Sequence, residues 1–306
     1  MPPIYRLTTL LIIVFLYPVV SLSAENAMHS YSYTAMLGHY QQLKTSLTSN
    51  QYGAPISIQS SFKDNAANGE VYALLDHDFD TVVNTLGNAG QWCDVLLLHV
   101  NVKGCENSAG QDASDNMKVY VGRNYYQTPD EAYSMQYMFA VKDVSEDFAR
   151  VELSSADGPF GTSDYLITFE AIPFDSSKTF IHFKYAYQYG VMAKLAINSY
   201  LATLGRHKVG FSIESYDDNH EPVYVKGLQG IVERNSMRYF IAIRSYLDTN
   251  SLDREQWFPR VDRWYSLARP FNKQLIEVED GGYLETKQQE YKNREKLSTA
   301  ELKSGW

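Results

Sequence analysis

Basic residues are scarce in this sequence of 306 residues, which has 27 Lys and Arg against 36 Asp and Glu and a formal net charge of -9. Proteins that bind DNA or RNA neutralise phosphates with a basic surface. The acidic balance therefore argues against nucleic acid as a partner. Linkers, low-complexity stretches and internal repeats are also lacking, so we expect one elaborated domain after the N-terminal segment.

Long apolar runs are rare as well. The only candidate is residues 10–20, which follow the positive Arg6. Small residues, among them Ser23 and Ala24, come next, as in a signal peptide. The run contains Pro18 and is shorter than the roughly 20 residues that a membrane-spanning helix needs. We expect cleavage after Ser23 or Ala24, no integral membrane segment in the mature protein, and a periplasmic or secreted location.

The sequence has two cysteines, Cys93 and Cys105. In an exported protein a nearby pair is most simply a disulfide, and closing a loop of this length contributes on the order of 3 kcal/mol in the chain-entropy model. The alternative is a metal site that includes His99, but three ligands at this spacing match no zinc pattern. We therefore expect a disulfide, no metal site and no cofactor.

Catalytic signatures are missing. The sequence has no Gly-x-Ser-x-Gly and no His-Glu-x-x-His motif, and residues 158–162 lack the lysine of a phosphate-binding loop, so a tight turn is expected there. His99 is conceivable as a general base because the pKa of a free imidazole is near 6.5. A loop histidine bonded to the backbone is the simpler interpretation. Whether the chain is an enzyme stays open, and non-enzymatic binding is favoured.

Tyrosine, by contrast, is abundant, with 24 residues. Between residues 117 and 189, extended segments alternate with turn residues, which indicates a meander of antiparallel strands. In the last segment, alternation places Tyr185 and Tyr187 on one face of the sheet. His182 and Lys184 fall on the other face, which we expect to be solvated. The aromatic face is either ordinary core or the wall of a pocket.

Helices are expected on both sides of this meander. Apolar spacing predicts an N-terminal helix within 30–48, a helix at 193–204 and the longest helix at 228–249. Between the first helix and the meander we expect extended segments and two short helices. The tail, 287–303, is charged and expected to be solvated or frayed.

This order of elements resembles START-like members of the SRPBCC helix-grip superfamily, and within it an uncharacterised exported branch. The resemblance runs from Ile56 to about Asp248. It implies an α+β helix-grip fold: a curved antiparallel sheet around a long C-terminal helix, with a cavity for a hydrophobic ligand and with extra N- and C-terminal helices in this chain. The motifs that carry it are residues 69–76 (GEVYALLD), 92–94 (WCD), 98–101 (LHVN), 158–162 (GPFGT) and 233–239 (ERNSMRY).

The chain then divides into four parts. These are a signal peptide (1–24), an N-terminal helical segment (25–55), the START-like domain (56–250) and a C-terminal helical extension (251–306).

Polar residues on the long helix are candidates for ligand binding. A 100° step places Asn235 within the apolar stripe and Arg238 at its edge. Arg234 lies one turn from Arg238, and like charges at that spacing need an anion between them. We expect these residues to bind the polar end of an amphiphile. The full set of expected ligand-binding residues is Asn235, Arg238, Arg234, Tyr239, Tyr185 and Tyr187. The alternative is that the arginines pair with the sheet acids Glu152, Asp164 or Glu170 and fasten helix to sheet.

The sequence thus predicts an exported protein that holds a hydrophobic or amphipathic, lipid-like small molecule between the sheet and the long helix, with transient membrane contact left open. One alternative is an enzyme of the same fold, a cyclase or hydrolase, that uses His99 or the Glu233 group. Another is a structural envelope protein whose own side chains fill the cavity.

Overall fold

The computed structural model describes residues 21–108, 114–203, 205–253, 256–277 and 282–293. Most of the expected signal peptide lies outside these residues, as does the end of the charged tail.

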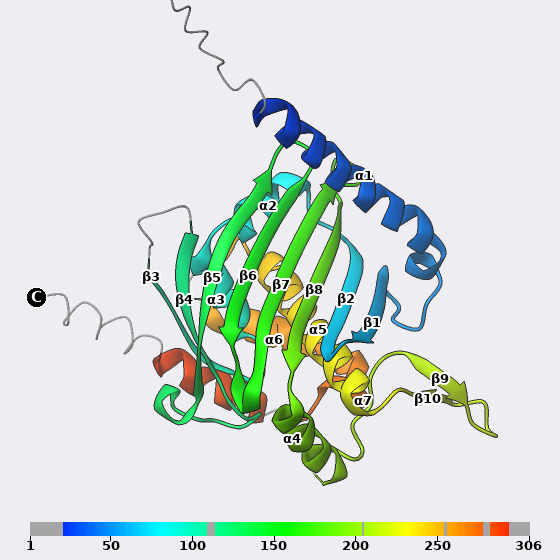
Figure 1. Ribbon diagram of the computed structural model, residues 1–306, viewed down its shortest axis with the longest axis vertical. Coiled ribbons are helices and arrows are strands. Elements are labelled where there is room, and N and C mark those ends of the chain that lie inside the picture. Colours follow the sequence, from blue (N-terminus) through cyan, green and yellow to red (C-terminus); the bar gives the residue numbers. More distant parts are fainter. Residues whose placement is uncertain (1–20, 109–113, 204, 254–255, 278–281, 294–306) are drawn as a thin grey trace, which may run out of the picture.

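An eight-stranded antiparallel sheet forms the body of the protein (Figure 1), with the strand order β1-β2-β8-β7-β6-β5-β4-β3. The sequential meander from β4 to β8 was expected from the turn spacing, whereas β3 was not expected. The first hairpin joins the sheet through β8, because β2 pairs with β8 along its whole length. The strands are β1 Ile56–Lys63, β2 Ala66–Leu75, β3 Val102–Ser108, β4 Ser114–Val121, β5 Tyr133–Val144, β6 Ala149–Asp157, β7 Thr162–Pro173 and β8 Thr179–Tyr189.

The long helix α5, Gly227–Leu247, packs on β1, β2 and β8. Gly69 of β2 lets the two backbones approach, since a Cβ there would lie 2.3 Å from Ser236 Oγ. The short helices α2, Phe79–Leu86, and α3, Ala89–Leu97, cover the same side of the sheet (Figure 1). A curved sheet that holds a long helix against its concave face confirms the expected α+β helix-grip fold.

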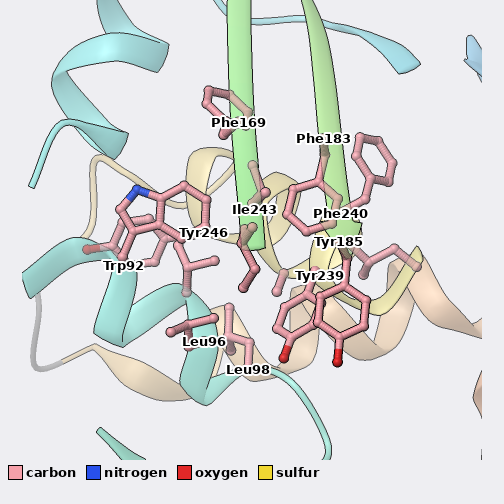
Figure 2. Close-up of a cluster of buried hydrophobic side chains, with 14 of the residues drawn as sticks. Trp92, Leu96, Leu98, Phe169, Phe183, Tyr185, Tyr239, Phe240, Ile243 and Tyr246 are labelled. Atoms are coloured by element: carbon pink, nitrogen blue, oxygen red, sulfur yellow. The ribbon is translucent and has the colours of Figure 1, made fainter. Parts of the chain in front are cut away.

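Aromatic and aliphatic side chains fill the layer between sheet and α5 (Figure 2). Trp92 is fully buried, and its Nε1 donates to the Leu86 carbonyl at 2.8 Å. The expected disulfide is present: Cys93 of α3 joins Cys105 of β3, with a Cα–Cα distance of 5.3 Å. It fastens the first edge of the meander to the helices.

A second, smaller core lies on the convex face of the sheet under α1, Ser21–Thr48. This helix overturns one expectation, because His182 is buried rather than solvated. The Tyr72 ring stacks on the imidazole at 4.4 Å. Period-two alternation finds the two faces of a strand but not what covers each face.

The C-terminal part is more ordered than expected. Residues 282–293 form a helix in which Lys287 and Glu290 are buried, so the expectation of a solvated tail is wrong for this stretch. The remaining elements are η1 Pro129–Glu131, η2 Pro159–Gly161, α4 Val191–Ala202, β9 Ile213–Tyr216, β10 Pro222–Tyr224, α6 Trp257–Ala268, η3 Arg269–Phe271 and α7 Asn272–Leu275.

Candidate functional site

Five tyrosines meet between the sheet and α5, and we call them the tyrosine cluster. Rings of neighbouring members lie close together, with centroid distances of 5.3 Å for Tyr165–Tyr187 and 5.3 Å for Tyr185–Tyr239. In Figure 2 the hydroxyls of Tyr185 and Tyr239 point the same way, away from Phe183 and Phe240. The members are Tyr137 of β5, Tyr165 of β7, Tyr185 and Tyr187 of β8, and Tyr239 of α5.

The cluster supplies neutral hydrogen-bonding groups within an apolar layer. Burial raises the pKa of each of its five hydroxyls above the ordinary value, so all are protonated at neutral pH. A phenol both donates and accepts, and a buried one normally finds a partner. Tyr165, for example, shares a hydrogen bond of 2.8 Å with Thr162 Oγ1. The cluster is therefore suited to an uncharged oxygen of a ligand.

His99, just after α3, flanks the cluster. Its ring stacks on Tyr239 at 4.3 Å, and only 2% of the residue is exposed. The backbone N–H of Asn101 donates to Nδ1 at 3.2 Å, so the neutral imidazole carries its proton on Nε2. That Nε2 is buried and has no hydrogen-bond partner among the described residues. An unsatisfied buried donor costs about 1–3 kcal/mol.

The imidazole is held in its neutral form. Burial, reinforced by the nearby charges of Arg238 and Lys287, lowers the pKa of His99 well below its usual value. The backbone contact that was expected for His99 is thus present. The sequence did not indicate that its Nε2–H would lie beside Tyr239 without a hydrogen-bond partner among the described residues. Nothing in residues 98–101 indicates that the ring stacks on a helix residue far along the chain.

Arg238 lies on another side of α5 and binds the C-terminal extension. Its Nη2 donates to Glu277 Oε1 at 2.7 Å, and Lys208 Nζ donates to the same oxygen at 2.7 Å. Burial alone would raise the pKa of Glu277, but Arg238 and Lys208 lower it to about 2. Glu277 is therefore the anion that the paired arginines require.

Arg234 is buried next to Arg238, and its Nη1 donates to the Val209 carbonyl at 3.2 Å. The partners expected in the sheet are engaged elsewhere, since Glu152 and Glu170 both bind Arg150 and Asp164 accepts from Ser163 Oγ. Sequence spacing could not find Glu277, which lies just after α7, 39 residues beyond Arg238.

The expected ligand-binding residues thus separate into two groups. Tyr239, Tyr185 and Tyr187 belong to the tyrosine cluster. Arg234 and Arg238 instead bind the Val209 carbonyl and Glu277, and the half-buried Asn235 accepts from Arg238 Nη1 at a long 3.5 Å.

Glu233, a candidate in the enzyme alternative, anchors α5 to its surroundings. Its carboxylate is fully buried and accepts from Ser60 Oγ at 2.8 Å and from the Phe211 and Ser212 backbone N–H groups. With its oxygens occupied by these donors, Glu233 is a structural group that joins α5 to β1 and to residues 211–212.

Two pockets beside these groups are small. A pocket of about 10 Å³ lies beside Glu277 and Tyr283, and another of about 120 Å³ lies beside Tyr52 and Phe271. Pockets for drug-sized ligands measure about 300–1,000 Å³. Aromatic side chains of the described residues occupy the layer where the resemblance places a ligand cavity.

Comparisons with known proteins concern the fold. Solved structures similar to this chain include human StAR-related lipid transfer protein 5, at 9% identity and a TM-score of 0.35, over 74% of this chain and 100% of that one. A STAR-related lipid transfer protein fragment from Xanthomonas axonopodis is 10% identical with a TM-score of 0.35, over 63% of this chain and 98% of that one. The chain has a helix-grip fold. The Zhui aromatase/cyclase from Streptomyces is also similar, at 8% identity and a TM-score of 0.33, over 68% of this chain and 95% of that one.

Structural similarity at these identities and TM-scores gives no information on the ligand or the activity of this chain. No protein-family model and no curated protein matches the chain. Within the residues that the structure describes, no helix has the length and apolarity needed to cross a membrane, and no three His, Cys, Asp or Glu side chains are grouped to hold a metal ion.

Proposed function

We propose that this chain is an exported binding protein for an amphipathic small molecule, held at the tyrosine cluster between the sheet and α5. The observation that carries the proposal is the free Nε2–H of His99 beside Tyr239, in a layer of aliphatic side chains, aromatic rings and protonated phenols. A ligand oxygen bound there would satisfy the buried donor.

The chemistry of the cluster selects among ligands. Phenols and a neutral imidazole fit a carbonyl, hydroxyl or ether oxygen, and ring faces fit a flat apolar body. A carboxylate fits less well, because Arg238 is already paired with Glu277. In this proposal Arg238, Arg234 and Asn235 position α5, and Arg238 also favours the neutral form of His99. Arg238 reaches the ligand only if Glu277 releases it.

The proposal requires the aromatic layer to open. The cluster members each retain 4–9% exposure. Aromatic side chains that turn to new rotamers could create room for a small ligand, and the contacts they lose would be replaced by contacts with the ligand.

Native mass spectrometry of the purified protein, followed by extraction, tests the proposal. We expect a stoichiometric small molecule, or its uptake from a panel of sterols, fatty acyl esters and aromatic polyketides. His99→Phe keeps the ring stacking but removes the donor and should lower affinity by about tenfold, the value of one hydrogen bond in a buried site. Tyr216→Phe, on the exposed hairpin, is the matched control. A ligand that binds His99→Phe as tightly as the unchanged protein would contradict the proposed site.

The filled aromatic layer favours one second candidate, a structural envelope protein that binds no small molecule. An empty protein that takes up no member of the panel would establish this alternative over the binding function.

A further inference from the structure

Helix α4 is apolar but hardly buried. Its sequence, VMAKLAINSYLA, has Lys194 as its single charged residue, and Ala193 is its single buried one. In Figure 1 the helix projects past the end of β8, beyond the edge of the sheet. A helix that is apolar over most of its surface is normally buried in a protein or a membrane. Most of the apolar surface of α4 is therefore exposed, although its sequence is typical of a buried helix.

The turn η2 adds a second apolar element at the same place. Phe160 is 78% exposed and has φ 59°, a left-handed conformation that is rare for a bulky residue. A Cβ on the adjacent Gly161 would lie 3.9 Å from Met192 Cβ, so turn and helix touch. Val191 is 77%, Met192 72% and Leu195 57% exposed. We call Phe160, Val191, Met192 and Leu195 the apolar tip.

The apolar tip is connected to the tyrosine cluster through the turn. A Cβ on Gly158 would lie 2.2 Å from the Tyr165 ring, so the turn packs directly on a member of the cluster. The tip therefore lies at the end of the sheet where the cluster is found.

We propose that the apolar tip docks on an anionic lipid surface. At 1.5 Å per residue, the 12 residues of α4 span about 18 Å, too short to cross a hydrocarbon core of about 30 Å but long enough to lie in the interface. Residues 191–209 contain no Asp or Glu, although the whole chain carries a charge of -9. Lys194 and Arg206 are exposed there and suit anionic head groups.

The apolar side chains supply most of this affinity, because Asp157 and Asp164 border the turn and offset part of the positive charge. Docking of the tip does not depend on a ligand at the tyrosine cluster.

Vesicle flotation tests the proposal, with vesicles of phosphatidylcholine and phosphatidylglycerol and with vesicles of phosphatidylcholine alone. We expect the purified protein to float with the mixed vesicles, and to do so less at high salt. Phe160→Gly and Met192→Ser should each lower the partition coefficient by about tenfold, because each removes one inserted apolar side chain. Met138→Ser is the matched control, since Met138 is 51% exposed on β5 and should leave binding unchanged.

Phe160→Gly also separates binding from folding. Glycine adopts positive φ without strain, so the melting temperature should stay the same or rise while vesicle binding falls. Absence of binding by the unchanged protein, or an equal loss in Met138→Ser, would overturn the proposal. Equal binding to both vesicle types would contradict the electrostatic contribution that is assigned to Lys194 and Arg206. A concentration-dependent dimer in light scattering that Phe160→Gly abolishes would assign the tip to a second copy of the chain.

Discussion

His182 on the convex face is held between two carboxylates, with Nδ1 2.8 Å from Glu170 Oε2 and Nε2 3.1 Å from Glu70 Oε2. Burial alone would lower the pKa of His182, but the two carboxylates raise it above its usual value. The hydrogen bond from His182 in turn lowers the pKa of Glu70 to about 2. A single imidazole therefore joins β2, β7 and β8 beneath α1, and the two carboxylates favour its charged form.

This residue makes stability depend on pH. A raised histidine pKa contributes stability that is fully present below about 6.5, the ordinary imidazole pKa, and is lost as pH rises through the folded-state pKa. The depressed pKa of Glu70 adds stability that is present above about 4.5 and is lost as pH falls towards 2. We expect His182→Gln to lower the free energy of unfolding by about 1.5–3 kcal/mol near pH 5.5 and by clearly less near pH 9. Urea denaturation at the two values checks this, and an equal loss at both would contradict the charged bridge.

Among the helices and strands, those whose sequence pattern depends on local spacing were predictable from the sequence. Alternation and turn residues located β4 to β8, and the apolar stripe located α5, each close to its observed bounds. β3 was missed because VKGCENS shows no clean alternation. The burial of the helix at 282–293 was missed because its buried face includes Lys287 and Glu290, which the sequence analysis took for solvent-exposed charges.

Prediction of the candidate site from the sequence was limited in the same way, to contacts that depend on local spacing. Tyr185 and Tyr187 were predictable as an inward-facing pair, since both lie on one strand. The Arg238–Glu277 pair and the stacking of His99 on Tyr239 join residues that are far apart in the sequence. No periodicity reports on such contacts, because they depend on where whole elements pack.

The helix at 282–293 is fastened by a buried charge network. Glu290 accepts from Lys103 Nζ at 2.7 Å and from Lys287 Nζ at 2.7 Å, and all three side chains are almost completely buried. Lys287 also donates to the His99 carbonyl at 2.7 Å. The network ties the last helix to the segment that carries His99.

We expect Glu290→Gln to destabilise the protein by about 3–5 kcal/mol, because it leaves two buried ammonium groups without their counter-charge. Glu285→Gln changes an exposed residue of the same helix and should have an effect below about 0.5 kcal/mol. Thermal or urea denaturation of both variants makes the comparison. Similar stability of the two would show that the network does not hold the helix in solution.

For the whole molecule, the C-terminal extension shares the main core instead of forming a separate unit. Trp257, Trp264 and Leu275 pack in the same cluster as α5 and the sheet, and the Tyr283 hydroxyl donates to the Leu98 carbonyl at 2.8 Å. We therefore expect a chain that ends at residue 250 to lose cooperative unfolding, with Arg238 left buried and unpaired. Near-ultraviolet circular dichroism and calorimetry check this. A cooperative transition in the shortened protein would show that residues 56–250 fold alone.

The pairing of β2 with β8 determines the order in which the strands of the sheet can pair during synthesis. Ala66 lies opposite Gln188, so the hairpin that starts the sheet has no neighbour on its inner side until more than a hundred further residues have been made. Contacts of such long sequence separation form slowly, because loop closure must precede them. A chain that emerges N-terminus first therefore cannot complete its sheet until β8 has been made, and β1 and β2 remain without their partner strand through most of its synthesis.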